Sequence, residues 1–265
     1  MKLGFIANNS LDGLQADCQL AQVLGFRGLE FNYWGDFANL TDDTVAQQKA
    51  IIDEFGIECS TFGIWGWNHI SPDAAEREKC HAAFERAIGY AQVLGAPVLI
   101  TGGGKFVDGE IQPNVDEYAR VMPRLLDQAA EAGLKVCLYG FHGGSFLDTI
   151  DGYEALWEKV PNVGLKCDPA NIDHAGQDYL RMLKDHGDRV YHVHLKEHLN
   201  YGGAVVSQPA VGMGDIQWGK VFAFLYEADY LGYLTVEPHG PKWSRGALHD
   251  KMLALTKKYV SQFLL

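Results

Sequence analysis

The chain has 265 residues, of which 47% are hydrophobic, 21% charged and 12% aromatic, and this composition predicts a globular protein with a sizeable buried core. It excludes a disordered chain, a collagen-like chain and a small scaffold held together by disulfides. The 34 Asp and Glu residues outnumber the 22 Lys and Arg, giving a net charge of −12. Because no run of five basic residues interrupts this surplus, we expect no binding to nucleic acid or to an anionic membrane.

Cysteine usage and the N-terminal segment predict a cytoplasmic protein. The cysteines are an odd number without a CxxC pair, which predicts reduced thiols: Cys18, Cys59, Cys80, Cys137 and Cys167. The start, MKLGFIANNS, has too short an apolar run for a signal peptide. No segment approaches the roughly 20 apolar residues of a membrane-spanning helix.

Eight short apolar runs rich in β-forming residues recur along the chain, and a stretch with helical spacing follows each of them. Eight units in 265 residues average about 33 residues, which is the size of a strand-plus-helix module. We therefore predict the α/β class and a single (β/α)8 TIM barrel as one domain over residues 1–265. The alternative is an open doubly wound sheet, but the expected GxGxxG turn is missing after the first run. The eight runs are 2–7, 28–32, 57–62, 97–102, 134–139, 163–168, 189–196 and 233–237.

Capping residues predict where the helices begin and end. Helix starts are indicated by polar or Pro-containing positions at Asp12, Thr41, Ser71-Pro72 and Asp215. Helix ends are indicated by glycines that take the left-handed conformation without steric cost, at Gly25, Gly56, Gly95, Gly133 and Gly232.

The seventh run, RVYHVHLKEH, carries the strongest chemical signal. Strand alternation places His192, His194 and Lys196 on one face, pointing into the barrel, and Val193 and Leu195 on the other. We expect His194, near the strand end, to be a metal ligand. His192 lies deeper in the barrel, and its position fits two roles equally well: a metal ligand, or an interior histidine held by hydrogen bonds.

Carboxylates end the runs on both sides of the seventh. Asp168 and Lys166 share a face at the end of the sixth run, where Pro169 stops the strand, and Glu237 ends the eighth run before another proline. Asp168 alone also fits a turn-initiating residue. Together with His194, however, the two carboxylates form a candidate site for Mn²⁺, which we expect first, or for Co²⁺, Mg²⁺ or Zn²⁺.

Other strand ends supply further candidates. His142 follows the fifth run and is the expected fourth ligand, although it also fits an ordinary residue of a glycine-rich loop. Glu30, at the end of the second run, is expected to orient a ligand or a sugar hydroxyl, or to pair with a group of the first or eighth strand. Substrate contacts are expected from an aromatic cluster, which also fits loop packing, and from two further polar residues: Trp34, Trp65, Trp67, His69, Lys166 and His239.

From Tyr139 to Gly240 the succession CDPANIDHAG, HVHLKEH, GMGDIQW and GYLTVEPHG resembles the xylose-isomerase-like TIM-barrel superfamily of sugar phosphate isomerases and epimerases, and the resemblance covers essentially the whole chain. It implies one divalent metal held by a glutamate, an aspartate, a histidine and a glutamate at the ends of strands 5 to 8. Asp168, His194 and Glu237 match the last three ligands. Where many relatives read Glu-Asn-His-Gly-Gly, residues 140–144 of this chain read Gly-Phe-His-Gly-Gly, so the glutamate is replaced by Gly140 while the histidine, His142, is kept.

The resemblance implies a metal-dependent isomerase or epimerase that abstracts a proton next to the carbonyl of a sugar or keto-sugar. Glu237 or His142 would take the proton, and Lys196 or Lys166 would neutralise the developing oxyanion. The missing glutamate makes elimination a rival: a dehydratase or lyase acting on a keto-sugar, 3-keto-glycoside or inosose. Weaker alternatives are an endonuclease IV-like hydrolase, which the −12 charge opposes, and a sugar-binding barrel without catalysis. The expected partner is a sugar or cyclitol, and the resemblance also implies dimers or tetramers.

Overall fold

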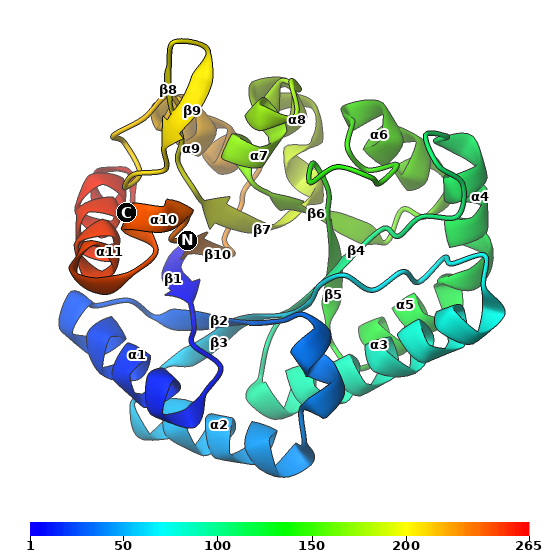
Figure 1. Cartoon of the computed structure of the whole chain (residues 1–265), viewed down its shortest axis with the longest axis horizontal. Helices are drawn as coiled ribbons and strands as arrows, with labels where there is room; N and C mark the ends of the chain where they lie inside the picture. Colours follow the sequence, from blue (N-terminus) through cyan, green and yellow to red (C-terminus); the bar gives the residue numbers. More distant parts are fainter. Residues whose placement is uncertain (265) are drawn as a thin grey trace.

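The structure is a computed structural model that describes residues 1–264, in which eight parallel strands form a closed barrel (Figure 1). The predicted (β/α)8 barrel is therefore confirmed. The open sheet is wrong, because the first strand pairs with both the second and the last. The barrel strands are β1 (Lys2–Ile6), β2 (Gly28–Tyr33), β3 (Glu58–Ile64), β4 (Val98–Gly102), β5 (Lys135–Tyr139), β6 (Val163–Cys167), β7 (Val190–Leu195) and β10 (Tyr233–Val236).

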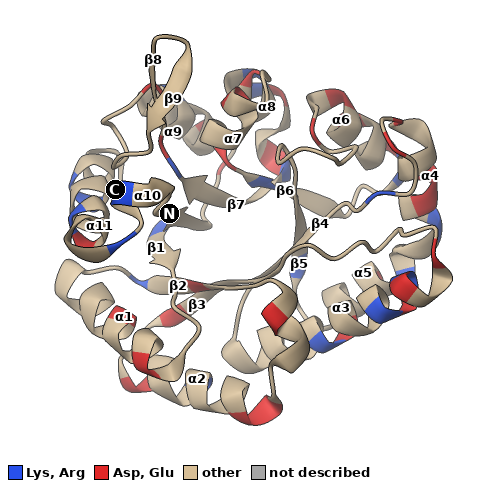
Figure 2. Cartoon of the chain, viewed as in Figure 1, with Lys and Arg blue, Asp and Glu red and all other residues tan. Residues whose placement is uncertain are grey.

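Helices surround the barrel, and Figure 2 shows many of the acidic residues, in red, on these outer helices. The α-helices are α1 (Leu11–Leu24), α2 (Asp42–Glu54), α3 (Ala74–Leu94), α4 (Gln112–Val121), α5 (Pro123–Glu131), α6 (Ile150–Lys159), α7 (Pro169–His174), α8 (Tyr179–His186), α9 (Trp218–Glu227), α10 (Gly240–Trp243) and α11 (Gly246–Val260). Short 3₁₀ helices are η1 (Gly35–Asn39), η2 (Gly187–Arg189) and η3 (Ser261–Phe263). No helix within residues 1–264 combines the length and the apolar character needed to cross a membrane.

The main hydrophobic core lies between the barrel and the helices. Strand alternation explains this location. Val193 and Leu195 of β7 are fully buried in this core, while His194 between them points into the barrel. An antiparallel hairpin, β8 (Leu199–Tyr201) and β9 (Ala204–Ser207), interrupts the connection from β7 to α9 and projects from the barrel at the top of Figure 1. The five cysteines are buried and free, as predicted.

Several predicted helix ends are confirmed. Thr41 caps α2 by accepting a hydrogen bond from the backbone N–H of Thr44. Gly25 and Gly95 end α1 and α3 in the left-handed conformation. Gly232 is an exception: the left-handed residue after α9 is Asp229, with φ 52°.

Three predicted helix starts are wrong. Ser10, not Asp12, caps α1, because the Ser10 side chain accepts from the backbone of the first turn. Asp73 caps α3, because the hydroxyl of Ser71 donates to Glu76 instead. Asp215 does not cap α9, since its carboxylate accepts two hydrogen bonds from Asn200 in the hairpin segment.

Candidate active site

A cavity of about 920 Å³ opens where the carboxyl ends of the barrel strands meet. It is lined by residues that follow β5, β6, β7 and β10, among them His142, Asn171, Lys196 and Glu237, and His194 lies at its base. The catalytic residues of TIM barrels come from this end of the strands. The predicted chemistry-bearing strand ends therefore converge on one cavity.

The structure brings Asp168, His194 and Glu237 together, as the sequence predicted. One potential ligand atom from each lies within 4.8 Å of the other two. Asp168 directly follows β6 and caps α7, while the backbone N–H of Glu237 donates to Leu195 of β7. These local hydrogen bonds hold the carboxylates of Asp168 and Glu237 on either side of the His194 imidazole. An imidazole nitrogen with two carboxylates is a donor set suited to Mn²⁺, Co²⁺ or Zn²⁺.

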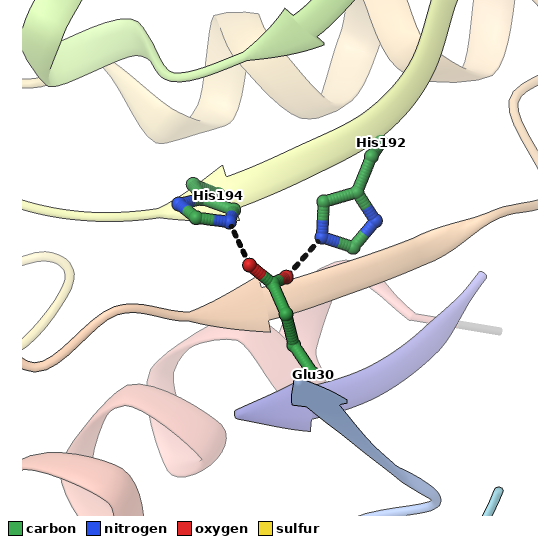
Figure 3. A group of neighbouring side chains, drawn as sticks. All are labelled: Glu30, His192 and His194. Atoms are coloured by element: carbon green, nitrogen blue, oxygen red, sulfur yellow. Dashed lines mark hydrogen bonds and ion pairs between the residues drawn. The ribbon is translucent and has the colours of Figure 1, made fainter. Parts of the chain in front are cut away.

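Glu30 joins this group from the opposite wall of the barrel (Figure 3). Its Oε1 lies 2.8 Å from Nε2 of His194, and its Oε2 lies 2.6 Å from Nε2 of His192. The predicted partner on strand 1 or strand 8 is therefore wrong. The inward side chain of β2 reaches across the interior to β7, a strand with which β2 does not pair.

The ionisation of Glu30 determines the orientation of both histidines. Burial alone would raise the pKa of Glu30, but the imidazoles of His194 and His192 hold this pKa well below its usual range. An ionised carboxylate only accepts hydrogen bonds, so each histidine donates from Nε2. The other nitrogen of His194, Nδ1, then faces Glu237 Oε2 at 2.9 Å.

The surroundings of His194 favour the protonated form of its imidazole. Burial lowers the pKa of His194, but Glu30 and Glu237 outweigh this effect and raise the pKa above its ordinary value. The two carboxylates thus favour a proton on Nδ1 of this ring. A divalent ion at Nδ1 would displace that proton, while the Nε2–H bond to Glu30 would stay in place, as metal-bound histidines usually require.

Two buried lysines balance most of the negative charge. Nζ of Lys166 donates to Asp168 Oδ2 at 3.1 Å, and Nζ of Lys196 donates to Asn171 Oδ1 at 3.1 Å and to Glu237 Oε1 at 3.4 Å. Asp168, Glu237 and Glu30 thus face two ammonium groups, and a proton on His194 would supply the third positive charge, the one that a metal ion would replace. The pKa of Glu237 stays well below its usual range: burial opposes ionisation, but hydrogen bonds from His194 and His239 and the charge of Lys196 outweigh it.

Asn171 is a site residue that the sequence analysis missed. Its side-chain amide donates to Asp168 Oδ2 at 2.8 Å and lies 3.4 Å from Nε2 of His142, and its carbonyl oxygen accepts from Lys196. The signal was its spacing, three residues after the helix-capping Asp168, which places it at the first turn of α7. Asn171 therefore links the fifth, sixth and seventh strand ends.

His142 lines the cavity but lies outside both groups of potential ligand atoms found within residues 1–264. Burial, together with the charge of Lys166, lowers the pKa of His142 to about 4, so the ring is neutral at pH 7 and retains a free lone pair. The half-exposed His239 contacts Glu237, with 3.2 Å between Nδ1 and Oε1.

The fifth strand end has no room for the glutamate that the resemblance led us to expect. A Cβ atom on Gly140 would collide with the carbonyl oxygen of Leu147 and lie 2.9 Å from the hydroxyl of Tyr153. The loop after β5 folds back over this position, and the N–H of Phe141 donates to Leu147. The glycine is thus a packing requirement of this loop.

Two of the predicted aromatic contacts lie at the cavity. Trp65 stacks on Tyr139, with 4.2 Å between ring centroids and 20° between planes, and its indole N–H donates to Asn32 Oδ1. Trp34 stacks on the other side of Trp65, at 5.7 Å and 22°. Both tryptophans line the cavity.

Trp67 and His69 lie away from the cavity, and the prediction that they bind substrate is not retained. Trp67 packs edge-on against Phe37. His69 is fully buried, and its Nε2 lies 2.7 Å from the hydroxyl of Thr101. The path of the loop after β3 directs both side chains away from the cavity, and they make packing contacts instead. Thr101 opens the TGGGK segment, and its bond to His69 makes it part of the structural core.

A second residue that the sequence analysis missed, Glu197, holds the segment between β7 and α9. Its buried carboxylate accepts hydrogen bonds from the backbone of His198, Gly212 and Ile216 and from the indole of Trp218. These donors belong to both ends of the segment that carries the β8–β9 hairpin. Glu197 therefore closes this long insertion at its base.

Comparison with known proteins agrees with this fold. The sequence model of the family described as "Xylose isomerase-like TIM barrel" matches residues 18–259. The chain is 25% identical over 232 residues to an inosose dehydratase from Lactiplantibacillus plantarum, covering 77% of this chain and 76% of that protein. The solved D-psicose 3-epimerase from Clostridium cellulolyticum H10 superposes with a TM-score of 0.82 at 16% identity, covering 100% of this chain and 99% of that one. A xylose isomerase-like TIM barrel protein from Mycobacterium smegmatis, solved in complex with magnesium, superposes with a TM-score of 0.76 at 18% identity, covering 100% and 96%.

Proposed function

Because the chain belongs to the xylose isomerase-like TIM barrel family, we propose that it is a divalent-metal-dependent enzyme that removes a proton next to the carbonyl of a keto-sugar or inosose and then eliminates a β-oxygen. The observation that carries this proposal is the asymmetry of the site. Glu237 stands on one side of the cavity, and the place of a second facing carboxylate is occupied by Gly140, which accepts no side chain. Epimerisation by two facing glutamates is thus disfavoured, whereas elimination needs only one acid/base group.

Asp168, His194 and Glu237 would hold the metal. The donor set of two carboxylates and one imidazole, together with the Nε2–H bond from His194 to Glu30, fits a divalent cation. Bound there, the ion would act as a Lewis acid on the carbonyl oxygen.

His142 is the proposed base. Its imidazole is neutral at pH 7 and faces the cavity, and within residues 1–264 its one side-chain hydrogen bond is a long one with Asn171. Nε2 takes the proton from the carbon next to the carbonyl, and the ammonium of Lys196 stabilises the negative charge that develops on the oxygen. The bond from the β-carbon to its oxygen then breaks, and the departing oxygen takes the proton from His142.

Isomerisation or epimerisation is the second candidate, favoured by the access of His142 and Glu237 to the same cavity. If the β-oxygen stays in place and the proton returns to the opposite face or to the neighbouring carbon, the same first step gives this outcome.

Incubation with scyllo-inosose or a 3-keto-hexose in D₂O, with Mn²⁺, Co²⁺, Mg²⁺ or Zn²⁺ supplied in turn, tests the proposal. An enone product supports elimination, and deuterium at the α-carbon without loss of oxygen supports the second candidate. His142→Asn should slow proton removal by about 10²-fold to 10⁴-fold, whereas His249→Asn, on helix α11, should not. A protein that binds no divalent ion, or that binds one and exchanges no α-proton, would refute the proposal.

A further inference from the structure

The cavity is larger than one sugar ring requires. Its volume of about 920 Å³ lies near the top of the roughly 300–1,000 Å³ range of sites that enclose drug-sized ligands. The reactive groups named above, His142, Lys196 and Glu237, line only part of it. The remaining lining includes Trp34 after β2 and Val205 and Gln208 of the hairpin segment.

A row of stacked rings leads from the candidate base toward solvent. His142 contacts the edge of Trp65, with centroids 6.0 Å apart, and Trp34 stacks on Trp65 at 5.7 Å. Trp65 is 6% exposed, whereas Trp34 is 61% exposed although it is packed against another ring. A sugar ring that reacts beside His142 would therefore leave the outer indole uncovered.

Trp34 is held in place before any ligand arrives. The indole N–H of Trp65 donates to Asn32, whose amide donates in turn to Glu30 at 2.8 Å. The backbone N–H of Trp34 donates to Asp36. The stack is thus anchored to the same carboxylate that orients His194, and a flat, pre-ordered apolar surface binds a ring with little loss of conformational entropy.

The charges around the cavity indicate an uncharged ligand. Within residues 1–264, Lys196 is the only Lys or Arg that lines the cavity, and Asn171 and Glu237 already engage its ammonium. Asp148 and Glu237 add negative charge to the wall. Away from the residues that would hold the metal, the described lining offers a phosphate group no unpaired ammonium and no arginine fork.

We propose that Trp34 forms a second-ring subsite, so that the substrate is an uncharged glycoside whose second ring, a sugar or an aromatic group, lies on this indole. The inference rests on the proposed function, in which the reacting sugar occupies the His142 end of the cavity. In the elimination, the departing oxygen would carry this second ring and leave as an alcohol or phenol after taking the proton from His142.

Binding without turnover tests this subsite independently of the reaction. Isothermal titration calorimetry would compare phenyl β-D-glucopyranoside with methyl β-D-glucopyranoside, neither of which carries the carbonyl that the reaction needs. We expect the phenyl glycoside to bind about 10-fold more tightly or better. Trp34→Ala should remove most of that difference, and Trp34→Phe should keep most of it. Leu231→Ala, at an exposed apolar site just before β10 at the other end of the barrel, should leave it unchanged.

Four results would overturn the inference. These are equal affinity of the wild-type protein for the two glycosides, no binding of either, equal weakening of both by Trp34→Ala, or tighter binding of phenyl glucoside 6-phosphate than of phenyl glucoside. If the phenyl preference depends on Trp34 but no α-proton exchange occurs with any keto-sugar, the subsite stands and the proposed reaction fails.

Discussion

The interior of the barrel has two sides that differ in chemistry. Strands β4 and β5, with the residue that follows β3, contribute an apolar side, which consists of Trp65, Val98, Ile100 and Cys137. The other side, here termed the ionic side, consists of Glu30, Lys166, Asp168, His192, His194, Lys196 and Glu237. Apolar side chains need only to fill space, whereas each buried charge needs a particular partner. The comparison teaches that the positions of the reactive groups depend on all residues of the ionic side together, because each charge is held by its neighbours.

The largest effect is expected from breaking the ionic side at its centre. Glu30→Ala leaves His192 and His194 without their acceptor and should lower the free energy of unfolding by about 3–5 kcal/mol. Urea denaturation would measure it. Glu85→Ala, which removes a partly exposed surface pair with Arg124, is the matched control and should cost at most about 1 kcal/mol. A similar loss of unfolding free energy in both variants would contradict the conclusion that the residues of the ionic side depend on one another.

A second experiment tests whether a carboxylate placed at the end of β5 can be added to the ionic side. Gly140→Ala and Gly140→Glu should each lower the free energy of unfolding by about 1–3 kcal/mol, because any Cβ there meets the backbone of Leu147. Thermal unfolding with and without Mn²⁺ would also show whether the added carboxylate improves metal binding, which we do not expect. Gly89→Ala, in α3 with open space around it, should be neutral or stabilising.

The third experiment compares two buried histidines. Burial, reinforced by nearby His81, lowers the pKa of His69 to about 3, while two carboxylates raise that of His194. Below its unfolded pKa of about 6.5, the unfolded chain binds a proton at residue 69 that the folded chain does not bind. Stability should therefore fall by about 1.4 kcal/mol for each pH unit between roughly pH 6 and pH 3 through His69 alone.

His69→Gln should remove this contribution and flatten the dependence of unfolding free energy on pH by one proton. His194 acts with the opposite sign: its stabilising contribution is present below pH 6.5 and is lost as pH rises through its raised pKa. Denaturation curves at several pH values would measure both, and an unchanged slope in His69→Gln would show that His69 is protonated in the folded protein.

The smallest effect is expected on the apolar side. Ile100→Val removes one methyl group from a packed cluster and should cost about 0.5–1.5 kcal/mol. Under the proposed function, proton exchange at the substrate carbon should stay close to that of the wild-type protein. A loss of activity comparable to that of His142→Asn would show that the two sides are not separable.

The sequence predicted the strand ends well, because a period of two and the prolines after Asp168 and Glu237 are local signals. It did not predict the partner of Glu30, since the two histidines that bind it lie more than 160 positions away and no periodicity records which inward side chains meet across a barrel. His69 resembled a site residue in the sequence, and only the path of the loop after β3 shows that it is packed in the core. Gly140 is a similar case, because the constraint comes from Leu147 in a folded-back loop.

The bond pattern of Glu197 has a consequence for how this protein could diversify. One buried carboxylate ties both ends of the β7 to α9 insertion together, and the hairpin beyond it contributes Val205 and Gln208 to the outer wall of the cavity. The hairpin is therefore an insertion whose base is held in place by the hydrogen bonds of Glu197. Its length and sequence can change, by drift or by grafting, without displacing the strand that carries His194. Ligand preference can in this way evolve separately from the chemistry.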